Sequence, residues 1–504
     1  MESHQATYEK LCAHARQTAL LTTTQSLLGF DERTKLPPAG GPYRAEQMSY
    51  LAGVIHQRQT APQLGEWLAQ LADSPLAADP HSDAGADIAG MRRDYNRKTK
   101  LPQALVEELA RLAVIGQQMW ALARKANDFA RFQPLLERIV ELKRQEAAAI
   151  GYQDVPYDAL LDEYEPGAKT KEVERALAGL REQLVPLVAE IAASPRRPDL
   201  GPLRRHYPIS MQEKFGREAA AAIGYDLTAG GLEVTNHPFC TTLGPRDVRL
   251  TTRYDADFFP GAFFSTLHEA GHGMYEQGLP AERFGLPTAE AVSLGIHESQ
   301  SRMWENLVGR SQAFWEHFFP RAKTAFETLG DVRLEDFYFA INDVRPSLIR
   351  TESDEATYNL HIMVRFELEQ ALLMDELRVA DLPAAWREKY RQYLGIEPPN
   401  DADGVLQDVH WSAGAIGYFP TYTLGNLYAA QLFEQAEREL GDLHAMFRRG
   451  EFRPLLQWLR EKIHSQGRRY PAAELAERVT GRPLSHDALM RHLRGKFAPL
   501  YDLA

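Results

Sequence analysis

His268, Glu269 and His272 form the run HEAGH, whose spacing is typical of a helical metal site. In an α-helix, positions i and i+4 lie one turn apart on one face, so two imidazoles there can bind the same metal ion. Glu269 can face the metal without binding it, which is the place for a general base acting on a metal-activated water. The surrounding stretch AFFSTLHEAGHGMYEQG contains no proline and is predicted to be helical. A chance pattern on an amphipathic helix is the alternative.

A third ligand is required, because a catalytic zinc ion takes about three protein ligands and keeps one position open. The later segment SLGIHESQSRMWENLVG has a helical pattern and carries His297 and Glu298. Glu298 follows His272 by 26 residues, which leaves room for a turn and an antiparallel return. Two histidines and one glutamate are the recurring ligands of zinc hydrolases, which favours Glu298, with His297 as the competing ligand. A polar pair facing solvent is the alternative for both. Gly271 leaves room for a neighbouring chain to approach.

The elements that position these residues are predicted to be mostly helices. Apolar residues recur at i, i+3 and i+4 over 103–150, 170–193, 311–328, 360–377 and 423–448. Pro- and Gly-rich breaks at 35–41, 74–87, 193–202 and 395–404 are typical of loops between helices. Between Leu232 and Tyr254 the pattern alternates with period two, which predicts a small antiparallel sheet. An edge strand beside the metal site could hold an extended peptide by main-chain pairing.

Composition excludes several classes of protein. The 504 residues are 44% hydrophobic and 25% charged, as in ordinary globular proteins. The net charge of -12 argues against nucleic-acid binding, which needs clustered Lys and Arg. No run of about 18 apolar residues predicts a membrane span. Two cysteines, Cys12 and Cys240, and a polar N-terminus without a signal-peptide pattern favour a reducing, cytoplasmic location.

Four further segments carry polar residues that packing alone does not require. Taken singly each is weak, because a lone arginine is usually a surface charge and a tyrosine beside a proline usually packs. The segments are NHPF with His237, DVRLT with Asp247 and Arg249, IRTESDEATY with Arg350, Glu352 and Asp354, and GVLQDVHWSAGAIGYFPTY with Gln407, Asp408, His410, Tyr418 and Tyr422.

Together with HEAGH and HESQ, these segments resemble the M32 family of metallocarboxypeptidases, the carboxypeptidase Taq type. That family is recognised by HPF, DxRxT, HExxH, HES(G/Q), IRxxAD and GxxQDxHW. All six occur here in the family's order, across about 175 residues. The stretch GFDERTKLPPAGGPYRAEQMSYLAGVIH also looks like the family's, so the resemblance runs nearly from end to end.

The chain departs from the family pattern at a few positions. Ser353 stands where the family has Ala, and Phe30 stands where it often has Trp. Thermolysin-type enzymes often place an Asp four residues after the ligand Glu to orient the first histidine, and here that residue is Arg302. The carboxylate that supports the histidine must then come from elsewhere, such as Asp354 or Asp408.

The resemblance adds weight to the metal site. His268, His272 and Glu298 are expected to hold Zn²⁺, and Co²⁺ or Mn²⁺ would fit the same ligands. Glu269 is expected to take a proton from water and pass it to the leaving amine.

The resemblance also suggests roles for the downstream segments. His410 and Tyr422, with Tyr418 close behind, are candidates for stabilising the oxyanion, as a downstream His and Tyr do in the angiotensin-converting and neurolysin type enzymes. A carboxypeptidase must bind a free C-terminal carboxylate, and Arg350 is the leading candidate for that role. The remaining candidates for substrate binding are Arg249, His237 and Gln407.

The periodicity predicts a mainly α-helical protein. The family resemblance implies a large HExxH zinc peptidase fold resembling the neurolysin and angiotensin-converting enzyme type. We expect one domain over 1–504, with helical lobes around a deep cleft and the small antiparallel sheet beside it. It would remove single residues from peptide C-termini with broad side-chain preference, and family members are typically homodimers. The alternatives are an oligoendopeptidase with the same zinc chemistry, or a non-catalytic helical scaffold whose structural zinc Cys240 could complete.

Overall fold

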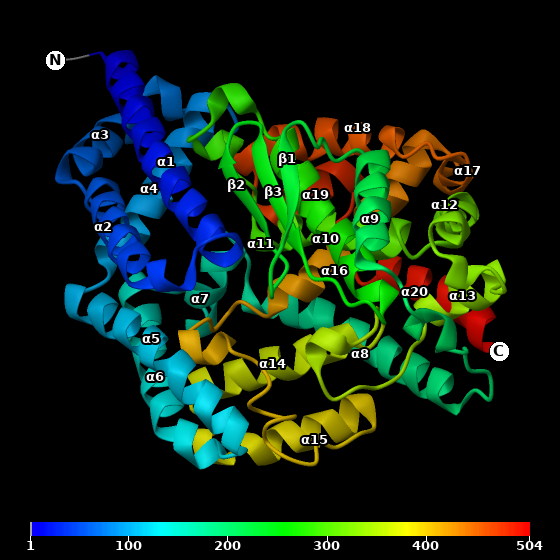
Figure 1. Ribbon diagram of the computed structural model, residues 1–504. Coiled ribbons are helices and arrows are strands. Elements are labelled where there is room, and N and C mark those ends of the chain that lie inside the picture. The colour runs from blue at the N-terminus through cyan, green and yellow to red at the C-terminus, as the bar shows by residue number, and fades with distance from the viewer. Residues whose placement is uncertain (1–2, 504) are drawn as a thin grey trace. The chain divides into compact units, whose positions relative to one another are not determined.

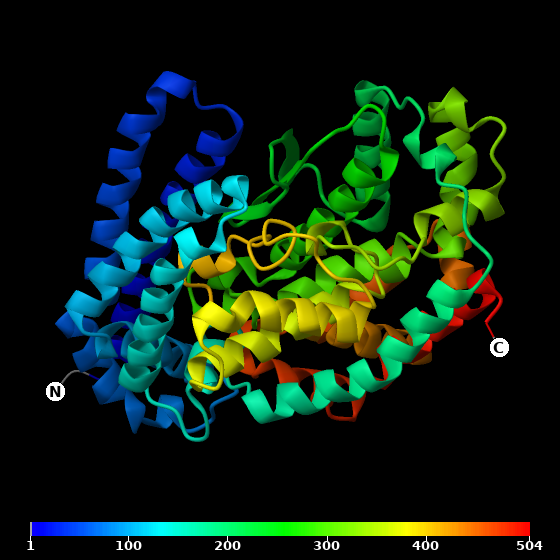
Figure 2. The ribbon, with the colours of Figure 1, turned by 90° about the horizontal axis from the view of Figure 1, so that it is seen from below.

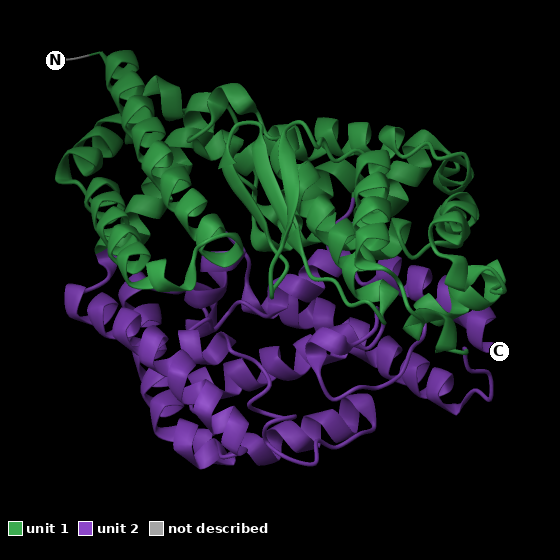
Figure 3. Cartoon of the chain, in the orientation of Figure 1, with its two compact units in different colours: residues 1–99, 199–341, 432–481 green, residues 100–198, 342–431, 482–504 purple. Residues whose placement is uncertain are grey.

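Helices predominate in the computed structural model, which describes residues 3–503 (Figure 1). The chain forms two compact units, each assembled from three stretches of sequence (Figure 3). Unit 1 comprises Met1–Thr99, Asp199–Ile341 and Leu432–Gly481, and unit 2 comprises Lys100–Pro198, Asn342–Gln431 and Arg482–Ala504. A single domain over 1–504 stays a prediction, because a compact unit is not necessarily a domain.

Unit 1 combines helices with the only sheet of residues 3–503, and much of its core is aromatic. Phe263 of α10 packs against Phe215 of α9, against Phe259 of its own helix, and against Phe314 and Trp315 of α12. Offset and edge-to-face ring pairs of this kind add to the stability that their burial gives. The helices of unit 1 are α1 (His4–Thr34), α2 (Gly41–Gln59), α3 (Pro62–Ala72), α4 (Asp83–Lys100), α9 (Ile209–Ile223), α10 (Phe259–Gly278), α11 (Leu294–Arg302), α12 (Gln312–Ala325), α13 (Leu334–Ile341), α17 (Leu443–Arg448), α18 (Arg453–Lys462) and α19 (Ala472–Thr480).

The sheet of unit 1 is mixed, so the prediction of an antiparallel sheet is wrong in part. Its strands are β1 (Gly230–Val234), β2 (Cys240–Gly244) and β3 (Asp247–Thr252), in the order β1-β3-β2. β2 and β3 form an antiparallel hairpin, whereas β1 runs parallel to β3. Alternation along the sequence reveals the two faces of a strand but not the direction of its neighbour, so it could not distinguish these pairings. The sheet packs on α10 through β3 and β2.

The described residues of unit 2 form helices and loops, without a strand. In it α14 and α15 lie side by side, and both views show this pair (Figures 1 and 2). Its helices are α5 (Gln103–Ala126), α6 (Phe129–Ile150), α7 (Pro156–Tyr164), α8 (Thr170–Ala193), α14 (Tyr358–Leu373), α15 (Leu382–Leu394) and α20 (Asp487–Tyr501). One more helix, α16 (Pro420–Leu440), begins in unit 2 and ends in unit 1.

The predicted helical segments are confirmed, with breaks where the backbone turns. The range 103–150 divides into α5 and α6, because Asn127 adopts a left-handed conformation and Asp128 caps α6 by accepting from the backbone N–H of Arg131. Gly441 (φ 89°) and Asp442 likewise separate α16 from α17. Within residues 3–503, no helix combines the length and the apolar character needed to cross a membrane.

Candidate active site

The HEAGH run lies on α10 in unit 1, as its spacing predicts. Pro260 occupies the first turn of this helix, where its missing N–H costs little. Phe263, Phe264 and Leu267 are buried and fix the helix in the core. A Cβ at Gly271 would lie 2.6 Å from the carbonyl oxygen of Gln300, so glycine allows α11 to pack directly on α10.

His268, His272 and Glu298, which we call the metal triad, lie together in the structure. Among the described residues they form the only cluster of His, Cys, Asp and Glu able to hold a metal ion, with ligand atoms within 4.8 Å of one another. Nε2 of His272 lies 3.6 Å from Oε2 of Glu298, and Nε2 of His268 lies 3.9 Å from the same oxygen. Both imidazoles therefore point their Nε2 atoms toward Glu298.

The other face of His268 is supported by Glu305, so the expected support from Asp354 or Asp408 is wrong. Nδ1 of His268 lies 2.9 Å from Oε2 of Glu305, within a π-helical turn over Met303–Val308 that continues α11. Asp354 instead accepts hydrogen bonds from backbone N–H groups at the start of α14. Glu305 follows Glu298 by seven residues, about two helical turns, which is the signal that could have identified it.

Arg302 links the two carboxylates of α11 and its π-helical extension. Its Nε donates to Oε1 of Glu298 at 2.7 Å, and its Nη1 donates to Oε2 of Glu305 at 3.3 Å. Although burial opposes the charge of Glu305, Arg302 and the hydrogen bond from His268 lower the pKa of Glu305 to about 2. Glu305 is therefore ionised at neutral pH, and Oε2 of Glu298 is left to face the histidines.

His297, the competing ligand, lies behind His272 and not in the metal triad. Its Nδ1 is 2.5 Å from Nδ1 of His272, and its Nε2 is 2.9 Å from Oε1 of Glu276. Burial, reinforced by His297 and His268, lowers the pKa of His272 well below its usual value, so this imidazole is neutral. Cys240 is not part of the cluster either, and burial raises the pKa of its thiol well above the usual value.

Glu269 is buried beside the triad and, among residues 3–503, has no ion-pair partner that would hold its charge as Arg302 does for Glu305. Burial raises the pKa of Glu269 to about 7, although the neighbouring His268 opposes the shift. A carboxylate with this pKa can both accept and return a proton near neutral pH.

The donor set fits a zinc-type ion. Zinc favours tetrahedral nitrogen and oxygen ligands and needs neutral imidazoles and an ionised carboxylate. The triad offers two Nε2 atoms and one carboxylate oxygen on one side, while Glu305 and His297 face the Nδ1 atoms on the other. Outward hydrogen bonds of this kind fix the orientation of ligand histidines.

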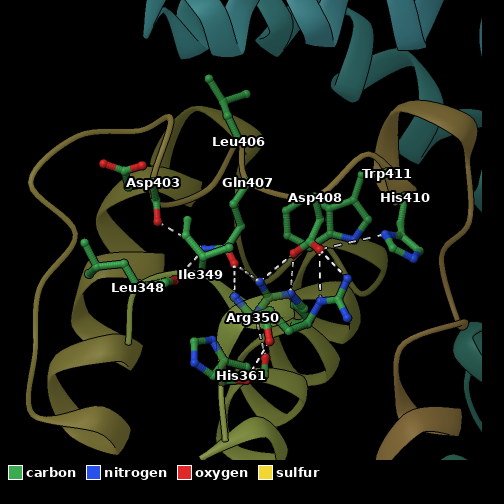
Figure 4. Close-up of polar contacts among 12 residues, drawn as sticks. Leu348, Ile349, Arg350, His361, Asp403, Leu406, Gln407, Asp408, His410 and Trp411 are labelled. Atoms are coloured by element: carbon green, nitrogen blue, oxygen red, sulfur yellow. Dashed lines mark hydrogen bonds and ion pairs between the residues drawn. The ribbon is translucent and has the colours of Figure 1, made fainter. Parts of the chain in front are cut away.

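A second polar cluster lies in unit 2 and surrounds Arg350 (Figure 4). Arg350 donates to Oδ1 of Asp408 from Nε at 3.0 Å and from Nη2 at 2.8 Å. Arg365, on α14, donates from Nε to Oδ2 of the same carboxylate at 2.6 Å. Gln407 accepts from Arg365 and from the backbone N–H of Arg350. We call Arg350, Arg365, Gln407 and Asp408 the guanidinium cluster.

The guanidinium cluster carries a surplus positive charge. Although burial opposes the charge of Asp408, Arg365 and Arg350 hold the pKa of this carboxyl well below its usual range. Two guanidinium groups therefore face one carboxylate. The fork of Arg350 is only partly used, because two N–H groups bind Asp408 and one binds the hydroxyl of Tyr358 at 3.1 Å. One N–H on each terminal nitrogen remains, which is the geometry that binds a carboxylate with two parallel hydrogen bonds.

His410, Tyr418 and Tyr422 lie close to one another in unit 2. The ring centroid of His410 is 5.3 Å from that of Tyr418 and 6.5 Å from that of Tyr422. The guanidinium of Arg350 lies 5.2 Å from the ring centroid of Tyr422. Burial lowers the pKa of His410 to about 4, against the attraction of Asp408. His410 is therefore neutral at pH 7 and keeps one N–H that can act as a donor.

The remaining candidates for substrate binding differ in how far they are engaged. His237 is exposed in the segment between β1 and β2 of unit 1. Arg249 on β3 is paired with Asp247 at 2.8 Å and 2.9 Å. Gln407 has three acceptors for its Nε2 group and two donors for its Oε1 atom, so it holds the guanidinium cluster together.

Sequence reasoning missed several residues that support these sites. Arg365 and Glu369 lie one turn apart on α14, and both are fully buried. Glu369 accepts from the indole of Trp411 and from the backbone N–H of Gly417, so it fixes the segment that follows His410. Charged residues within the otherwise apolar stretch YNLHIMVRFELEQALL were the available signal.

Comparisons of the sequence and of the structure with known proteins all match one family of carboxypeptidases. The model of the carboxypeptidase Taq (M32) metallopeptidase family matches residues 10–497. Thermostable carboxypeptidase 1 of Thermus thermophilus is 50% identical over 506 residues, 99% of each chain, and carboxypeptidase 1 of Bacillus subtilis is 38% identical over the full length of both chains. The crystal structure of an M32 carboxypeptidase from Deinococcus radiodurans is similar with a TM-score of 0.95 and 41% identity, covering 99% of this chain and 100% of the other.

Proposed function

Because this chain belongs to the carboxypeptidase Taq (M32) metallopeptidase family and is a peptide hydrolase, we propose that it is a zinc-dependent enzyme that releases single amino acids from free peptide C-termini. The metal triad carries this proposal, because its three ligand atoms converge within 4.8 Å while the remaining imidazole nitrogens contact supporting groups. The family implies a divalent metal, and the nitrogen and carboxylate donors favour zinc.

His268, His272 and Glu298 would hold the ion through Nε2, Nε2 and Oε2. When bound, zinc supplies a Lewis acid that polarises a carbonyl group and lowers the pKa of water. Glu269 accepts a proton from the attacking water and returns it to the nitrogen of the leaving amino acid. Its burial suits both steps, because a pKa of about 7 favours neither the charged nor the neutral form at pH 7.

Residues of unit 2 would contribute donors for the substrate. His410 is neutral at pH 7, so its N–H can donate to the oxyanion of the tetrahedral intermediate without bringing a full charge. The hydroxyl of Tyr422 is the second proposed donor, and Tyr418 is the alternative. Arg350 binds the substrate's terminal carboxylate through its two remaining N–H groups, supported by the surplus positive charge of the guanidinium cluster. Arg249 and His237 could assist.

The test is digestion of one defined peptide, prepared as free acid and as C-terminal amide, with products identified by mass spectrometry. We expect stepwise loss of single C-terminal residues from the acid, little cleavage of the amide, and no products after chelation. Adding Zn²⁺, Co²⁺ or Mn²⁺ separately to the chelated enzyme identifies the metals that restore activity. Internal cleavage of both peptides would instead support the oligoendopeptidase alternative, and metal binding without products would support a structural zinc.

Three expectations from the sequence, two of them from the family resemblance and the location from the cysteines and the N-terminal pattern, remain part of this proposal. They are a homodimeric state, a cytoplasmic location, and a fold related to the neurolysin and angiotensin-converting enzymes. Sedimentation equilibrium of the purified protein tests the first, and a monomer at micromolar concentration would contradict it.

A further inference from the structure

The metal-binding face of α10 extends one turn beyond the metal triad. His268, His272 and Glu276 occupy positions i, i+4 and i+8, so all three side chains line the same face of the helix. The side chain of Glu276 is only 17% exposed, and its two oxygens have separate partners. Oε1 lies 2.9 Å from Nε2 of His297, and Oε2 accepts the hydroxyl of Thr242 on β2 at 2.7 Å.

His297 connects Glu276 to the metal triad. Its Nδ1 lies 2.5 Å from Nδ1 of His272, so one of these two nitrogens must carry a proton and the other must accept it. A metal on Nε2 of His272 leaves the proton of that neutral ring on Nδ1. His272 then donates to Nδ1 of His297, and the proton of His297 must lie on Nε2, where it is donated to Glu276. The ring N–H groups of both histidines then point away from Nε2 of His272, the atom that would bind the metal.

We propose that Glu276 positions His272 for metal binding by fixing, through His297, the tautomer that leaves Nε2 of His272 free. This inference rests on the proposed metal site. His297 is a positioning residue here and not a ligand. The carboxylate of Glu276 accepts hydrogen bonds and has no hydrogen to donate, so it keeps the proton of His297 on Nε2.

The alternative tautomer shows why a carboxylate is needed at position 276. If the proton of His297 moved to Nδ1, it would point at His272, which would then have to accept through its own Nδ1. The proton of His272 would move to Nε2, the atom that must bind the metal. Glu276 opposes this state, because a carboxylate only accepts hydrogen bonds and would be left facing an unprotonated nitrogen.

The two ligand histidines are thus supported in different ways. His268 donates directly to the carboxylate of Glu305, whereas His272 reaches the carboxylate of Glu276 through one intervening imidazole. Removing a partner that orients a ligand typically weakens metal affinity about 10–100-fold. The relay therefore predicts that residues 276 and 297, neither of which touches the metal, control affinity at His272.

The experiment measures zinc affinity by competition with a chromophoric chelator, for the full-length protein prepared without metal. Glu276→Leu and His297→Leu remove the acceptors, and we expect each to weaken zinc binding about 10–100-fold. Two conservative variants should bind zinc more tightly than the corresponding leucine variants. Glu276→Gln keeps a carbonyl acceptor, and His297→Asn keeps an acceptor near the position of Nδ1. Glu282→Gln, an exposed carboxylate in the same unit, is the matched control and should bind as the wild type does.

The double variant Glu276→Leu/His297→Leu separates a relay from two independent packing effects. Because Glu276 acts only through His297, the double variant should bind zinc no more weakly than His297→Leu alone, whereas independent effects would multiply. The visible spectrum of the Co²⁺-loaded protein gives a second readout and should change in the leucine variants but not in Glu282→Gln. Thr242→Val, which removes the hydroxyl donor to Glu276, supplies a milder change should a leucine variant fail to fold.

The outcomes distinguish this inference from the proposed function. If the wild type fails to bind one zinc ion per chain, the proposed metal site is wrong. A second outcome would overturn the relay and leave the metal site in place. In it the wild type binds zinc, and the zinc affinities of both leucine variants, which are folded as judged by thermal unfolding, lie within twofold of the wild-type affinity with unchanged cobalt spectra. Multiplying losses in the double variant would also overturn the relay.

Discussion

The metal triad of unit 1 and the guanidinium cluster of unit 2 are both largely buried polar sites, but they are supported by opposite kinds of group. Around the triad, imidazole N–H groups meet acceptors, namely Glu305 directly and Glu276 through His297. In the guanidinium cluster, two permanent cations meet the single carboxylate of Asp408. The first site presents lone pairs and suits a cation, whereas the second presents unused N–H groups and suits an anion.

The two sites nevertheless follow the same rule of charge compensation. Burial raises the energetic cost of an unpaired charge at either site, so each ionised group needs a fixed partner. Arg302 provides it for Glu305, and Arg350 and Arg365 provide it for Asp408. Glu269 is the exception, since no arginine is paired with it and its pKa rises to about 7.

The largest expected effect comes from Glu269→Gln, which leaves the partners of the triad in place and removes the group that exchanges protons. The variant should retain one metal ion per chain and lose about 10²–10⁴-fold or more in kcat, because glutamine cannot accept the proton. Metal analysis and steady-state kinetics on the same preparation check both statements. A metallated variant with nearly wild-type kcat would remove Glu269 from the mechanism.

Tyr422→Phe tests whether the donors of unit 2 act on the transition state. The ring, and with it the contact to Arg350, is kept, while the hydroxyl is lost. We expect kcat to fall about 10²–10³-fold with little change in KM, as for removal of an oxyanion donor. Tyr418→Phe is the matched control. If Tyr418→Phe abolishes turnover and Tyr422→Phe does not, the assignment of the two tyrosines is reversed.

Amidation of the substrate tests the surplus positive charge of the guanidinium cluster. Replacing the terminal carboxylate by an amide should lower kcat/KM on the order of 10²-fold for the wild type. The reason is that the two hydrogen bonds from Arg350 lose the negative charge of their acceptor. Arg350→Ala should cleave the acid poorly and discriminate little between acid and amide. Arg350→Lys should also be impaired, since lysine keeps the charge and loses the fork.

Two results would contradict this account of Arg350. Equal cleavage of acid and amide by the wild type would show that the carboxylate is not recognised. Discrimination that survives in Arg350→Ala would assign the carboxylate to another residue, and Arg249 would be tested next by the same comparison.

The smallest expected effect concerns His464, which supports α11 in unit 1. Its buried ring lies with Nε2 at 3.0 Å from Oε1 of Gln300, and burial lowers the pKa of His464 to about 3. Between pH 6.5 and 3 the unfolded chain binds a proton that the folded protein does not, so stability falls as the pH falls. This one histidine should lower the free energy of unfolding by about 2 kcal/mol at pH 5 relative to pH 7.

His464→Gln isolates this contribution, because glutamine keeps a donor near the position of Nε2 and does not titrate. We expect the difference in Tm between the wild type and the variant to narrow, or to change in favour of the variant, as the pH falls from 7 to 5. A difference that is constant over this range would show that His464 is not held neutral.

Local patterns predicted a large part of this protein. Helical periodicity gave the range 170–193 as it stands in α8, and the HEAGH spacing gave two side chains on one face of α10. These predictions succeed because periodicity and spacing depend only on the geometry of a single element. Glycine between the histidines also signalled the close approach of α11, which a Cβ at Gly271 would prevent.

The partners of the site residues were decided by tertiary structure alone. The sequence by itself determined which residues could bind a metal and that most of the chain is helical. Only the packing of separate elements decided that Glu305 supports His268, that His297 lies behind His272, and that Asp408 binds two arginines. The direction of β1 was decided in the same way. The physical reason is that hydrogen bonds between elements depend on their relative orientation and register, which a pattern along one element does not contain.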